Sequence, residues 1–518
     1  MIGILLNDNS YEQDVRELLM AFFPREVFVH EVQEGLTLSA VGELDEARRH
    51  FRLHLIESGT EGGAWVKCAG QKMAGRIWNP EQGVPVADPD PVTEMEIEAA
   101  KRSDVLDVDY DGDRHDTKNR IKRRLYVLLM LYTGRQMPWG ALTGIRPTKI
   151  AMTKFDDGWD EARISRLMRE DYYASREKTT LAIEIAKRER ELLSRLDYRN
   201  GYSLYIGIPF CPTTCLYCSF TSYPIAKWQS RTGEYLQALF QELDYVAAKK
   251  QGCTLDTVYF GGGTPTSLSP EDLDILIRRL ETTFDLSAVK EFTVEAGRPD
   301  SITAEKLAVL KKHDVTRISI NPQTMKEETL RLIGRRHTVE DVIDRFHLAR
   351  EMGFENINMD LIIGLPEEGM DDVRATMEAV KALAPDSLTV HSLAIKRAAR
   401  LNTMREVYKD LTITNTQEMI DLTARCAREM GLLPYYLYRQ KNMAGNFENV
   451  GYAAPGKACI YNVLIMEERQ TIIGCGAGTT TKRVHPAENR IERAETVKDV
   501  GQYIARIDEM IARKERIL

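Results

Sequence analysis

The 518-residue chain lacks long apolar runs, and this excludes a protein that crosses a membrane through helices. No window approaches the about 18 consecutive apolar residues that a membrane-spanning helix requires. The richest patch, LYVLLMLY at residues 125–132, is much shorter. The first residues, MIGILLNDNSYEQDV, carry no basic segment and no small-residue cleavage site, so they predict a first strand rather than a signal peptide. We therefore expect a cytoplasmic protein with no membrane partner.

The chain also lacks an excess of positive charge. Its 70 Lys and Arg stand against 78 Asp and Glu, a net charge of -8, which gives no general attraction for nucleic acid. Hydrophobic residues make up 43% and charged residues 29% of the chain, which is the balance of a globular protein and excludes a disordered or collagen-like one. A chain of this length is expected to form about two to four domains.

Cysteine is scarce, with eight residues in the whole chain, yet three of them stand close together. The stretch YIGIPFCPTTCLYCSF places Cys211, Cys215 and Cys218 in the spacing C-x3-C-x2-C. In a reducing compartment such a group indicates a metal site or catalysis rather than disulfides. Three thiolates can hold three irons of a [4Fe-4S] cluster and leave the fourth iron open to a substrate or cofactor. Zinc is the alternative, but residues 201–260 contain no histidine to complete a zinc site.

Short apolar or β-branched runs after residue 202 predict six strands: SLYIGIPF (203–210), TVYFGGG (257–263), EFTVEAG (291–297), TRISINPQ (316–323), NINMDLIIGLP (356–366) and SLTVHSLAI (387–395). Segments with helix-start chemistry follow several of them, as in SPEDLDILIRRLE and TVEDVIDRFHLAREMG. The alternation predicts an α/β fold, either a partly closed (β/α)6 barrel or a doubly wound sheet. Polar residues gather at the carboxyl ends of the strands, where barrel active sites assemble, and this favours the barrel.

Four regions are expected along the chain. Residues 1–116 should form an α+β accessory region, residues 117–200 a helical region, residues 201–440 the barrel, and residues 441–518 a small C-terminal α+β region. In the last region, KACIYNVLIMEERQTIIGCGAGTTT predicts strands around a glycine turn, before a final helix. The interval MPWGALTGIRPTKI at 137–150 predicts either a binding loop with an exposed Trp139 or a connector between helices.

The cysteine motif, with the aromatic Tyr217 before its last cysteine, closely resembles that of the radical S-adenosylmethionine (radical SAM) superfamily. Within it, the segments YIGIPFCPTTCLYC, GGGTPT, VEAGRPD, INPQT, LIGRRHT and NMDLIIGLP resemble the oxygen-independent coproporphyrinogen III dehydrogenase (oxidase) family. The similarity runs from residue 203 to about residue 480, and the N-terminal extension is most like the longer branch called HemZ. The resemblance implies a partial (β/α)6 TIM-like barrel of the radical SAM type.

The resemblance also assigns site residues. Cys211, Cys215 and Cys218 would hold a [4Fe-4S] cluster, and Tyr205 and Glu295 are the catalytic candidates. The positions that would bind S-adenosylmethionine are Tyr217, Gly262, Gly263, Thr264, Glu295, Gln323, Arg335, Asp360, Ile362 and Ala394.

Side-chain chemistry agrees with several of these assignments. A guanidinium such as that of Arg335 suits a carboxylate, while Gln323 and Asp360 suit ribose hydroxyls. The triple-glycine turn at residues 261–263 suits the carboxylate or amino end of a ligand through exposed N–H groups. For Tyr205, Ile362 and Ala394, packing in the core is the competing interpretation.

The resemblance implies a radical oxidoreductase of porphyrin and haem biosynthesis. A reduced cluster gives one electron to the sulfonium, which yields methionine and a 5'-deoxyadenosyl radical. The radical takes a hydrogen from a propionate side chain, and loss of CO2 and one electron leaves a vinyl group. Two such rounds convert coproporphyrinogen III into protoporphyrinogen IX. The implied partners are a tetrapyrrole substrate and an electron-donor protein such as flavodoxin or ferredoxin.

The chain departs from the family pattern at informative positions. The best-characterised branch has a further cysteine where this chain has Phe220, and a histidine where it has Gly207. Related proteins with the same barrel carry haem instead of acting as dehydrogenases, and they typically show a His-Asn-x-x-Tyr-Trp motif. The aligned stretch here is YNVLIM, with Tyr461, Asn462 and Met466, so the histidine and both aromatics are missing. A haem carrier and another radical reaction on a tetrapyrrole remain the alternatives.

Overall fold

The computed structural model describes residues 1–24, 26–45, 47, 49–57, 65–68, 71–84, 92–101, 106–109, 113–144, 146–198, 200–396, 398–404, 406–408, 410–440, 447–488 and 490–518. The chain divides into two compact units. The first unit is Met1–Ile183 together with Arg439–Phe447, and the second is Glu184–Tyr438 together with Glu448–Leu518.

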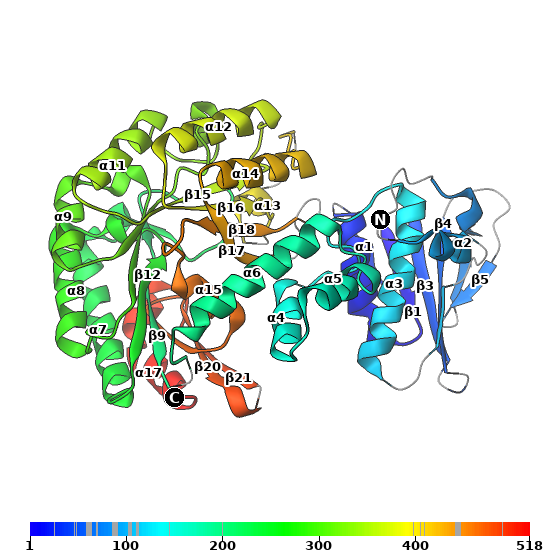
Figure 1. The fold of residues 1–518 in the computed structure, drawn as a ribbon, viewed down its shortest axis with the longest axis horizontal. Helices are drawn as coiled ribbons and strands as arrows, with labels where there is room; N and C mark the ends of the chain where they lie inside the picture. The colour runs from blue at the N-terminus through cyan, green and yellow to red at the C-terminus, as the bar shows by residue number, and fades with distance from the viewer. Residues whose placement is uncertain are drawn as a thin grey trace. The chain divides into compact units, whose positions relative to one another are not determined.

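The first unit contains a mixed sheet, with strands in the order β2-β1-β3-β4-β7 and with β8 paired to β4. Figure 1 labels β1, β3 and β4 of this sheet. The strand expected at the start of the chain is β1, which lies parallel to both β2 and β3. The bounds are β1 Ile2–Leu6, β2 Phe28–Val29, β3 Leu38–Asp45, β4 His50–Glu57, β7 Arg76–Ile77 and β8 Leu106–Asp109, with a separate hairpin of β5 Trp65–Cys68 and β6 Gln71–Ala74.

Helices complete the first unit, and apolar side chains of α1 and α3 join those of the sheet in one buried core. Helix α3 begins where the Asp113 carboxylate accepts the N–H of His115, and it ends at Gly134, whose φ of 65° suits a glycine. The helices are α1 Glu12–Phe22, α2 Glu94–Lys101, α3 Arg114–Thr133, α4 Thr148–Asp156, α5 Glu161–Glu170 and the first part of α6 Arg176–Ser194.

The position of Trp139 differs from the sequence-based expectation. The sequence suggested an exposed indole in a glycine-rich and proline-rich loop, but Trp139 is fully buried. The guanidinium of Arg439 lies over its ring at 5.9 Å from the centroid and donates to the carbonyl of Leu142. The segment that begins at Arg439 is distant in sequence but belongs to the same unit, so this partner could not be seen from the local pattern.

The second unit contains an eleven-stranded sheet in the order β17-β18-β16-β15-β14-β13-β12-β9-β19-β20-β21. Its six central strands are parallel and follow chain order, β9 Tyr202–Ile208, β12 Leu255–Gly262, β13 Glu291–Gly297, β14 Arg317–Ile320, β15 Ile357–Ile363 and β16 Ser387–Ser392. Strands that follow chain order in one direction are those of a singly wound barrel, whereas a doubly wound sheet reverses at a switch point. The predicted partial (β/α)6 barrel is therefore confirmed.

Helices lie along the outside of these strands. Figure 1 shows α7, α8, α9, α11 and α12 following one another around the sheet. Their bounds are α7 Thr232–Lys249, α8 Pro270–Thr283, α9 Ala304–Lys312, α11 Val339–Glu351 and α12 Met370–Leu383, and the remaining helices of the unit are α10 Glu327–Leu332, α13 Arg400–Thr403, α14 Gln417–Glu429, α15 Ile460–Glu467, α16 Val500–Ala505 and α17 Ile507–Glu515. The strands bury nearly continuous apolar runs between these helices and the barrel interior, as in Leu204, Ile206, Val258, Phe260, Ile318, Met359 and Leu361.

The C-terminal region extends both edges of the barrel sheet. β18 Asn449–Ala453 pairs antiparallel with β16, and β17 Leu433–Tyr438 pairs with β18. On the other edge β19 Thr471–Cys475 lies parallel to β9, followed by β20 Thr480–His485 and β21 Arg490–Glu495. The sheet is thus flanked by these strands rather than closed on itself.

One segment of this region is a helix where strands were predicted. Residues Ile460–Glu467 form α15. The Glu291 carboxylate accepts the N–H groups of Ile460 and Tyr461 at 2.7 and 3.2 Å, which satisfies the amide groups at the start of the helix. A short apolar run is ambiguous between a buried strand and a buried helix. Here the capping group comes from β13 and decides for the helix.

Within the described residues, no helix combines the length and the apolar character needed to cross a bilayer.

Candidate functional site

The predicted site residues gather at the carboxyl end of the barrel strands. Tyr205 lies on β9, Glu295 on β13 and Asp360 on β15, while the cysteine loop follows β9 directly. A short strand, β10 Phe210–Cys211, carries the first cysteine and pairs with β11 Tyr223–Pro224. Parallel strands bring these segments to one edge of the sheet, which explains why positions far apart in sequence share one site.

The cysteine loop is held by backbone groups from two later segments. The N–H of Leu216 donates to the carbonyl of Ile333 at 2.9 Å, and the carbonyl of Leu216 accepts the N–H of Leu401 at 3.0 Å. The hydroxyl of Thr213 donates to the carbonyl of Gly334 at 2.8 Å. Cys211 and Cys215 are buried, and Cys218 is partly exposed. The loop is therefore ordered by the barrel before any ligand is considered.

Hydrogen-bond donors reach the sulfurs of the cysteine loop, including that of Cys218, which accepts from Ser222. The Thr264 hydroxyl donates to Cys211 Sγ at 3.4 Å, and Arg298 Nη1 donates to Cys215 Sγ at 3.8 Å. Burial raises the pKa of the Cys211 thiol to about 12 and raises that of Cys218 as well. Among the described residues, no three His, Cys, Asp or Glu side chains stand close enough to hold a single metal ion. The case for the cluster rests on the loop, its sulfur donors and the relatives described below.

The glycine turn packs against the cysteine loop more tightly than the sequence suggested. A Cβ on Gly263 would lie 2.5 Å from the carbonyl oxygen of Phe210, and Gly262 has a φ of 103°. The N–H groups of Gly263 and Thr264 were expected to be free for a ligand. Instead they donate to the carbonyls of Ile208 and Phe210 at 2.8 and 2.7 Å. The turn thus joins β12 to the strand that leads into the cysteines.

Unpaired polar atoms beside the loop fit a polar ligand. Within the described residues, Gln323 Oε1, Asn321 Oδ1 and Arg335 Nε are buried without a hydrogen-bond partner. Gln323 also has a φ of 72°, in the left-handed region that a side chain disfavours. Its backbone bonds to Asp360 and Ile362 on β15 hold that conformation. Buried orphan groups and backbone strain are typical of ligand sites, so these residues fit the ribose and amino-acid groups of S-adenosylmethionine.

Arg335 faces the cysteine loop. Its Nη2 donates to the Tyr217 hydroxyl at 3.2 Å, and Nη1 contacts the Asn321 carbonyl and lies 3.3 Å from His337 Nε2. Burial, and then the neighbouring Arg335 charge, lower the pKa of His337 to about 4. His337 is therefore neutral at physiological pH. His337 is buried, so its side chain lies beside Arg335 rather than in solvent.

Asp360 is oriented by two neighbours that the sequence analysis did not assign. Asn358 Nδ2 donates to Asp360 Oδ1 at 2.7 Å, and His391 Nε2 lies 3.9 Å from Oδ2. Burial raises the pKa of Asp360, but the neighbouring His391 and the hydrogen bond from Asn358 outweigh it and lower the pKa overall. The Tyr438 hydroxyl meets His391 Nδ1 at 3.3 Å. An ionised carboxylate held in this way is a strong acceptor for hydroxyl groups.

Glu295 sits beside a group of three stacked tyrosines. The Tyr259 hydroxyl donates to Glu295 Oε1 at 2.6 Å. The Tyr259 ring stacks on Tyr461 at 4.4 Å between centroids, and Tyr205 stacks on both at 5.8 Å. Burial raises the pKa of Glu295 to about 7. Only Tyr205 and Glu295 of this group were predicted, because Tyr259 and Tyr461 meet them through packing between distant elements.

Ile362 and Ala394 are the remaining predicted residues. Ile362 is buried in a cluster with Leu216, Ile333 and Leu393, so part of its role is packing against the cysteine loop. Ala394 follows β16 and is partly exposed. Both positions border the strands that carry Asp360 and His391.

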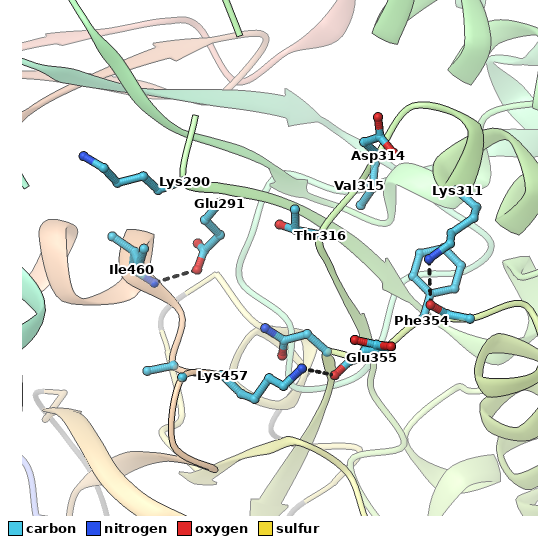
Figure 2. A pocket seen from close by; sticks show the side chains of 14 residues that line it. Lys290, Glu291, Lys311, Asp314, Val315, Thr316, Phe354, Glu355, Lys457 and Ile460 are labelled. Atoms are coloured by element: carbon cyan, nitrogen blue, oxygen red, sulfur yellow. Dashed lines mark hydrogen bonds between the residues drawn. The ribbon is translucent and has the colours of Figure 1, made fainter. Parts of the chain in front are cut away.

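A separate cavity of 410 Å³ lies at the opposite end of the barrel, where β13, β14 and β15 begin. Figure 2 shows its lining, in which Lys457 donates to the carbonyl of Glu355 and Glu291 accepts from Ile460. Lys311 likewise donates to the carbonyl of Gly353. Barrel enzymes place their chemistry at the carboxyl end of the strands, and residues at the amino end serve stability. This cavity is therefore distinct from the candidate site.

Known proteins resemble the chain over most of its length. A sequence model of the radical SAM superfamily matches residues 205–380. The chain is 44% identical over 406 residues to the oxygen-independent coproporphyrinogen-III oxidase-like protein HemZ of Bacillus subtilis. The aligned region covers 77% of this chain and 81% of that protein. It is 43% identical over 198 residues to the heme chaperone HemW of Bacillus subtilis. That aligned region covers 38% of this chain and 51% of HemW.

A solved structure agrees with the fold. The coproporphyrinogen III oxidase HemN of Escherichia coli, described as a radical SAM enzyme, matches with a TM-score of 0.50 and 23% identity, covering 62% of this chain and 72% of that chain. Enzymes of the radical SAM superfamily use a [4Fe-4S] cluster and S-adenosylmethionine, and the three cysteines and the buried polar atoms described above fit both groups. The chain therefore belongs to the radical SAM superfamily, in the family of oxygen-independent coproporphyrinogen III oxidase-like proteins that includes HemZ.

Proposed function

We propose that the protein is an oxygen-independent coproporphyrinogen III dehydrogenase, which converts two propionates into vinyl groups and yields protoporphyrinogen IX. The observation that carries this proposal is an amphipathic rim beside the cysteine loop. Porphyrinogens present apolar pyrrole faces and several carboxylates, so their binding site needs both apolar surface and cations.

We assign to this rim Phe220, which follows the cysteine motif, and Ile395, Lys396, Met404 and Val407, which lie on the segment after β16. Its apolar members are unusually exposed, Phe220 by 69% and Val407 by 67%. Lys396 Nζ lies 5.1 Å from the centroid of the Phe220 ring. The segment that follows β16 is anchored on the cysteine loop, because Leu393, Leu401 and Tyr408 share an apolar cluster with Leu216. A tetrapyrrole on this rim would place its pyrrole faces on the apolar side chains and a propionate near Lys396.

The protein's own contribution is to bind, orient and exclude water. Cys211, Cys215 and Cys218 would hold the cluster, and Gln323 and Asp360 would accept hydrogen bonds from ribose hydroxyls. Arg335 would face the carboxylate of S-adenosylmethionine. When bound, the cluster and S-adenosylmethionine supply the one-electron chemistry that removes hydrogen from the substrate. Glu295, whose pKa lies near 7, holds or releases a proton next to the Tyr259 hydroxyl.

A haem carrier is the second candidate, because the similarity to HemW covers 38% of the chain. Carriers have a histidine where this chain has Tyr461. The Tyr461 ring is buried and stacked on Tyr259 at 4.4 Å, inside the group of three tyrosines. A tyrosine packed in this way is less available to haem iron than a histidine on a surface loop, and this favours the dehydrogenase.

The deciding experiment is an anaerobic reaction of cluster-reconstituted protein with dithionite, S-adenosylmethionine and coproporphyrinogen III. Mass spectrometry should detect 5'-deoxyadenosine and the loss of two carboxyl groups, and both products should disappear in Cys215→Ala. The variant Lys396→Met should raise KM for the porphyrinogen while 5'-deoxyadenosine still forms. Stoichiometric haem binding without decarboxylation would instead support the carrier, and 5'-deoxyadenosine with an intact porphyrinogen would indicate a different substrate.

A further inference from the structure

Arg298 is a buried cation beside the cysteine loop to which the sequence analysis gave no role. It directly follows β13 and is 3% exposed. Its Nε and Nη2 donate to the two carboxylate oxygens of Asp300 at 2.9 and 2.6 Å. This bidentate pair fixes the plane of the guanidinium and leaves Nη1 directed elsewhere.

Nη1 of Arg298 points at the cysteine loop. It donates to the carbonyl of Thr213 at 3.1 Å, to the Thr213 hydroxyl at 2.6 Å and to Cys215 Sγ at 3.8 Å. The Thr213 hydroxyl in turn donates a hydrogen bond to the carbonyl of Gly334. The loop just before Cys215 is therefore fixed between the turn after β13 and the segment that carries Arg335.

The hydrogen-bond donors to Cys211 and to Cys215 differ in charge. Cys211 receives a bond from the neutral hydroxyl of Thr264, whereas Cys215 receives one from a guanidinium. Arg335 also acts on the Cys215 sulfur, but its guanidinium is bound to Tyr217 and Asn321. Hydrogen bonds and positive charge at a cluster sulfur stabilise the reduced cluster, which carries one more negative charge. Asp300 opposes this effect by partly neutralising Arg298.

We propose that Arg298 is a positioning residue that orients Cys215 and raises the reduction potential of the cluster, with Asp300 setting the size of the increase. The proposal depends on the cluster of the radical SAM superfamily and not on the identity of the substrate. Its test therefore uses cluster-loaded protein without any tetrapyrrole, so that it can fail or succeed apart from the proposed dehydrogenase.

The experiment is an anaerobic redox titration of the reconstituted full-length chain, followed by electron paramagnetic resonance of the reduced cluster. The variants are Arg298→Met, Arg298→Lys and Asp300→Asn. The control is Arg331→Met, because the Arg331 side chain on α10 is 73% exposed. At a potential equal to the wild-type midpoint, the ratio of reduced to oxidised cluster should be about tenfold lower in Arg298→Met than in wild type. This corresponds to a midpoint potential lowered by about 59 mV for a one-electron couple. Arg298→Lys should lower it less, and Arg331→Met should leave it unchanged.

Asp300→Asn provides the signature that a purely structural role would not produce. Removing this carboxylate leaves the Arg298 charge unopposed, so the reduction potential should rise, opposite to the change in Arg298→Met. Iron and sulfide analysis should show equal cluster content in the compared samples. Equal midpoints in Arg298→Met and wild type would overturn the proposal. If Arg298→Met does not assemble a cluster, a midpoint in Asp300→Asn that is unchanged or lowered would overturn it.

Discussion

At the scale of single residues, the carboxyl group of Glu295 in the candidate site has a pKa that should make stability depend on pH. Its pKa is raised by burial from 4.5 in the unfolded chain to about 7. Below both values the carboxyl is protonated in the folded and the unfolded chain alike. As the pH rises between them, the unfolded chain ionises first, so the folded state loses up to about 3 kcal/mol relative to the unfolded state.

The variant Glu295→Gln should remove this loss. Its Tm relative to wild type should therefore increase as the pH is raised from about 5 to about 7, and the gain should level off above pH 7, where the carboxyl is ionised in the folded chain as well. Differential scanning fluorimetry of the cluster-free protein measures this. Glu328→Gln, at an exposed position, controls for the loss of one negative charge. A Tm difference that stays constant over this range would contradict the raised pKa.

Gly263 offers a test of the contact between the glycine turn and the cysteine loop. In Gly263→Ala the added Cβ would meet the carbonyl oxygens of Phe210 and Ile208 at 2.5 and 2.8 Å, so the strand leading into Cys211 must move. Overpacking of this kind costs about 1–3 kcal/mol. We expect a lower Tm and less iron and sulfide bound per chain after reconstitution.

Gly233→Ala is the matched control for that substitution. Gly233 lies on α7, and within the described part of the chain no atom stands within 4 Å of the position of the new Cβ. Alanine also favours a helix, so this variant should keep its cluster content and its Tm or gain slightly. Equal cluster content in both variants would show that the Gly263 contact does not govern the loop.

At the scale of elements, the C-terminal helices are joined to the barrel through a buried charge pair. Lys514 on α17 contacts the Glu242 carboxylate on α7, and both side chains are fully buried. The same carboxylate accepts the Tyr503 hydroxyl at 2.6 Å and the N–H of Gly476 at 2.7 Å. One carboxylate thus connects α7, α16, α17 and the turn after β19.

Lys514→Met should destabilise the protein strongly, because it leaves the Glu242 charge buried without its cation. Removing one partner of a buried pair costs about 3–5 kcal/mol. Thermal unfolding should show a clear fall in Tm, whereas Arg516→Met, two residues further along and exposed, should not. Adding Glu242→Gln to Lys514→Met should recover part of the loss. A double variant less stable than Lys514→Met alone would contradict this interpretation.

The elements that the sequence predicted are those whose pattern is local. The six barrel strands and helices α8, α9 and α11 follow from apolar periodicity and capping residues within each segment. Helix α15 was missed because its capping carboxylate, Glu291, is 169 residues away from Ile460. Trp139 was misjudged for the same reason, since the segment at Arg439 covers it.

The same distinction applies to the site. The cysteines are recognisable because their spacing is contained in one loop, and Gln323 and Asp360 because they belong to the segments predicted as strands, where Gln323 follows β14 and Asp360 lies within β15. Asn358 and Arg298 act through contacts that the fold creates, on Asp360 and Cys215 respectively. A charged residue directly after a strand, as in VEAGRPD, is a sequence signal that could have indicated Arg298.

At the scale of the whole molecule, the two compact units have different relations to the proposed ligand. The three cysteines, Gln323, Arg335 and Asp360 all belong to the second unit, Glu184–Tyr438 with Glu448–Leu518. The first unit has its own buried core of sheet, α1 and α3. A ligand that binds only the folded form of one unit stabilises that unit by mass action, by about 2.7 kcal/mol at a concentration of 100 Kd.

Calorimetry of the cluster-loaded protein should therefore show two overlapping unfolding transitions. S-adenosylmethionine should raise the Tm of only one of them, that of the second unit. Gln323→Ala should reduce that shift, because it removes the buried Oε1 that has no partner among the described residues. Gln136→Ala, in the first unit, is the matched control and should leave the shift intact. A single transition that moves as a whole would mean that the two units unfold cooperatively, and an equal shift in Gln323→Ala would remove Gln323 from the S-adenosylmethionine site.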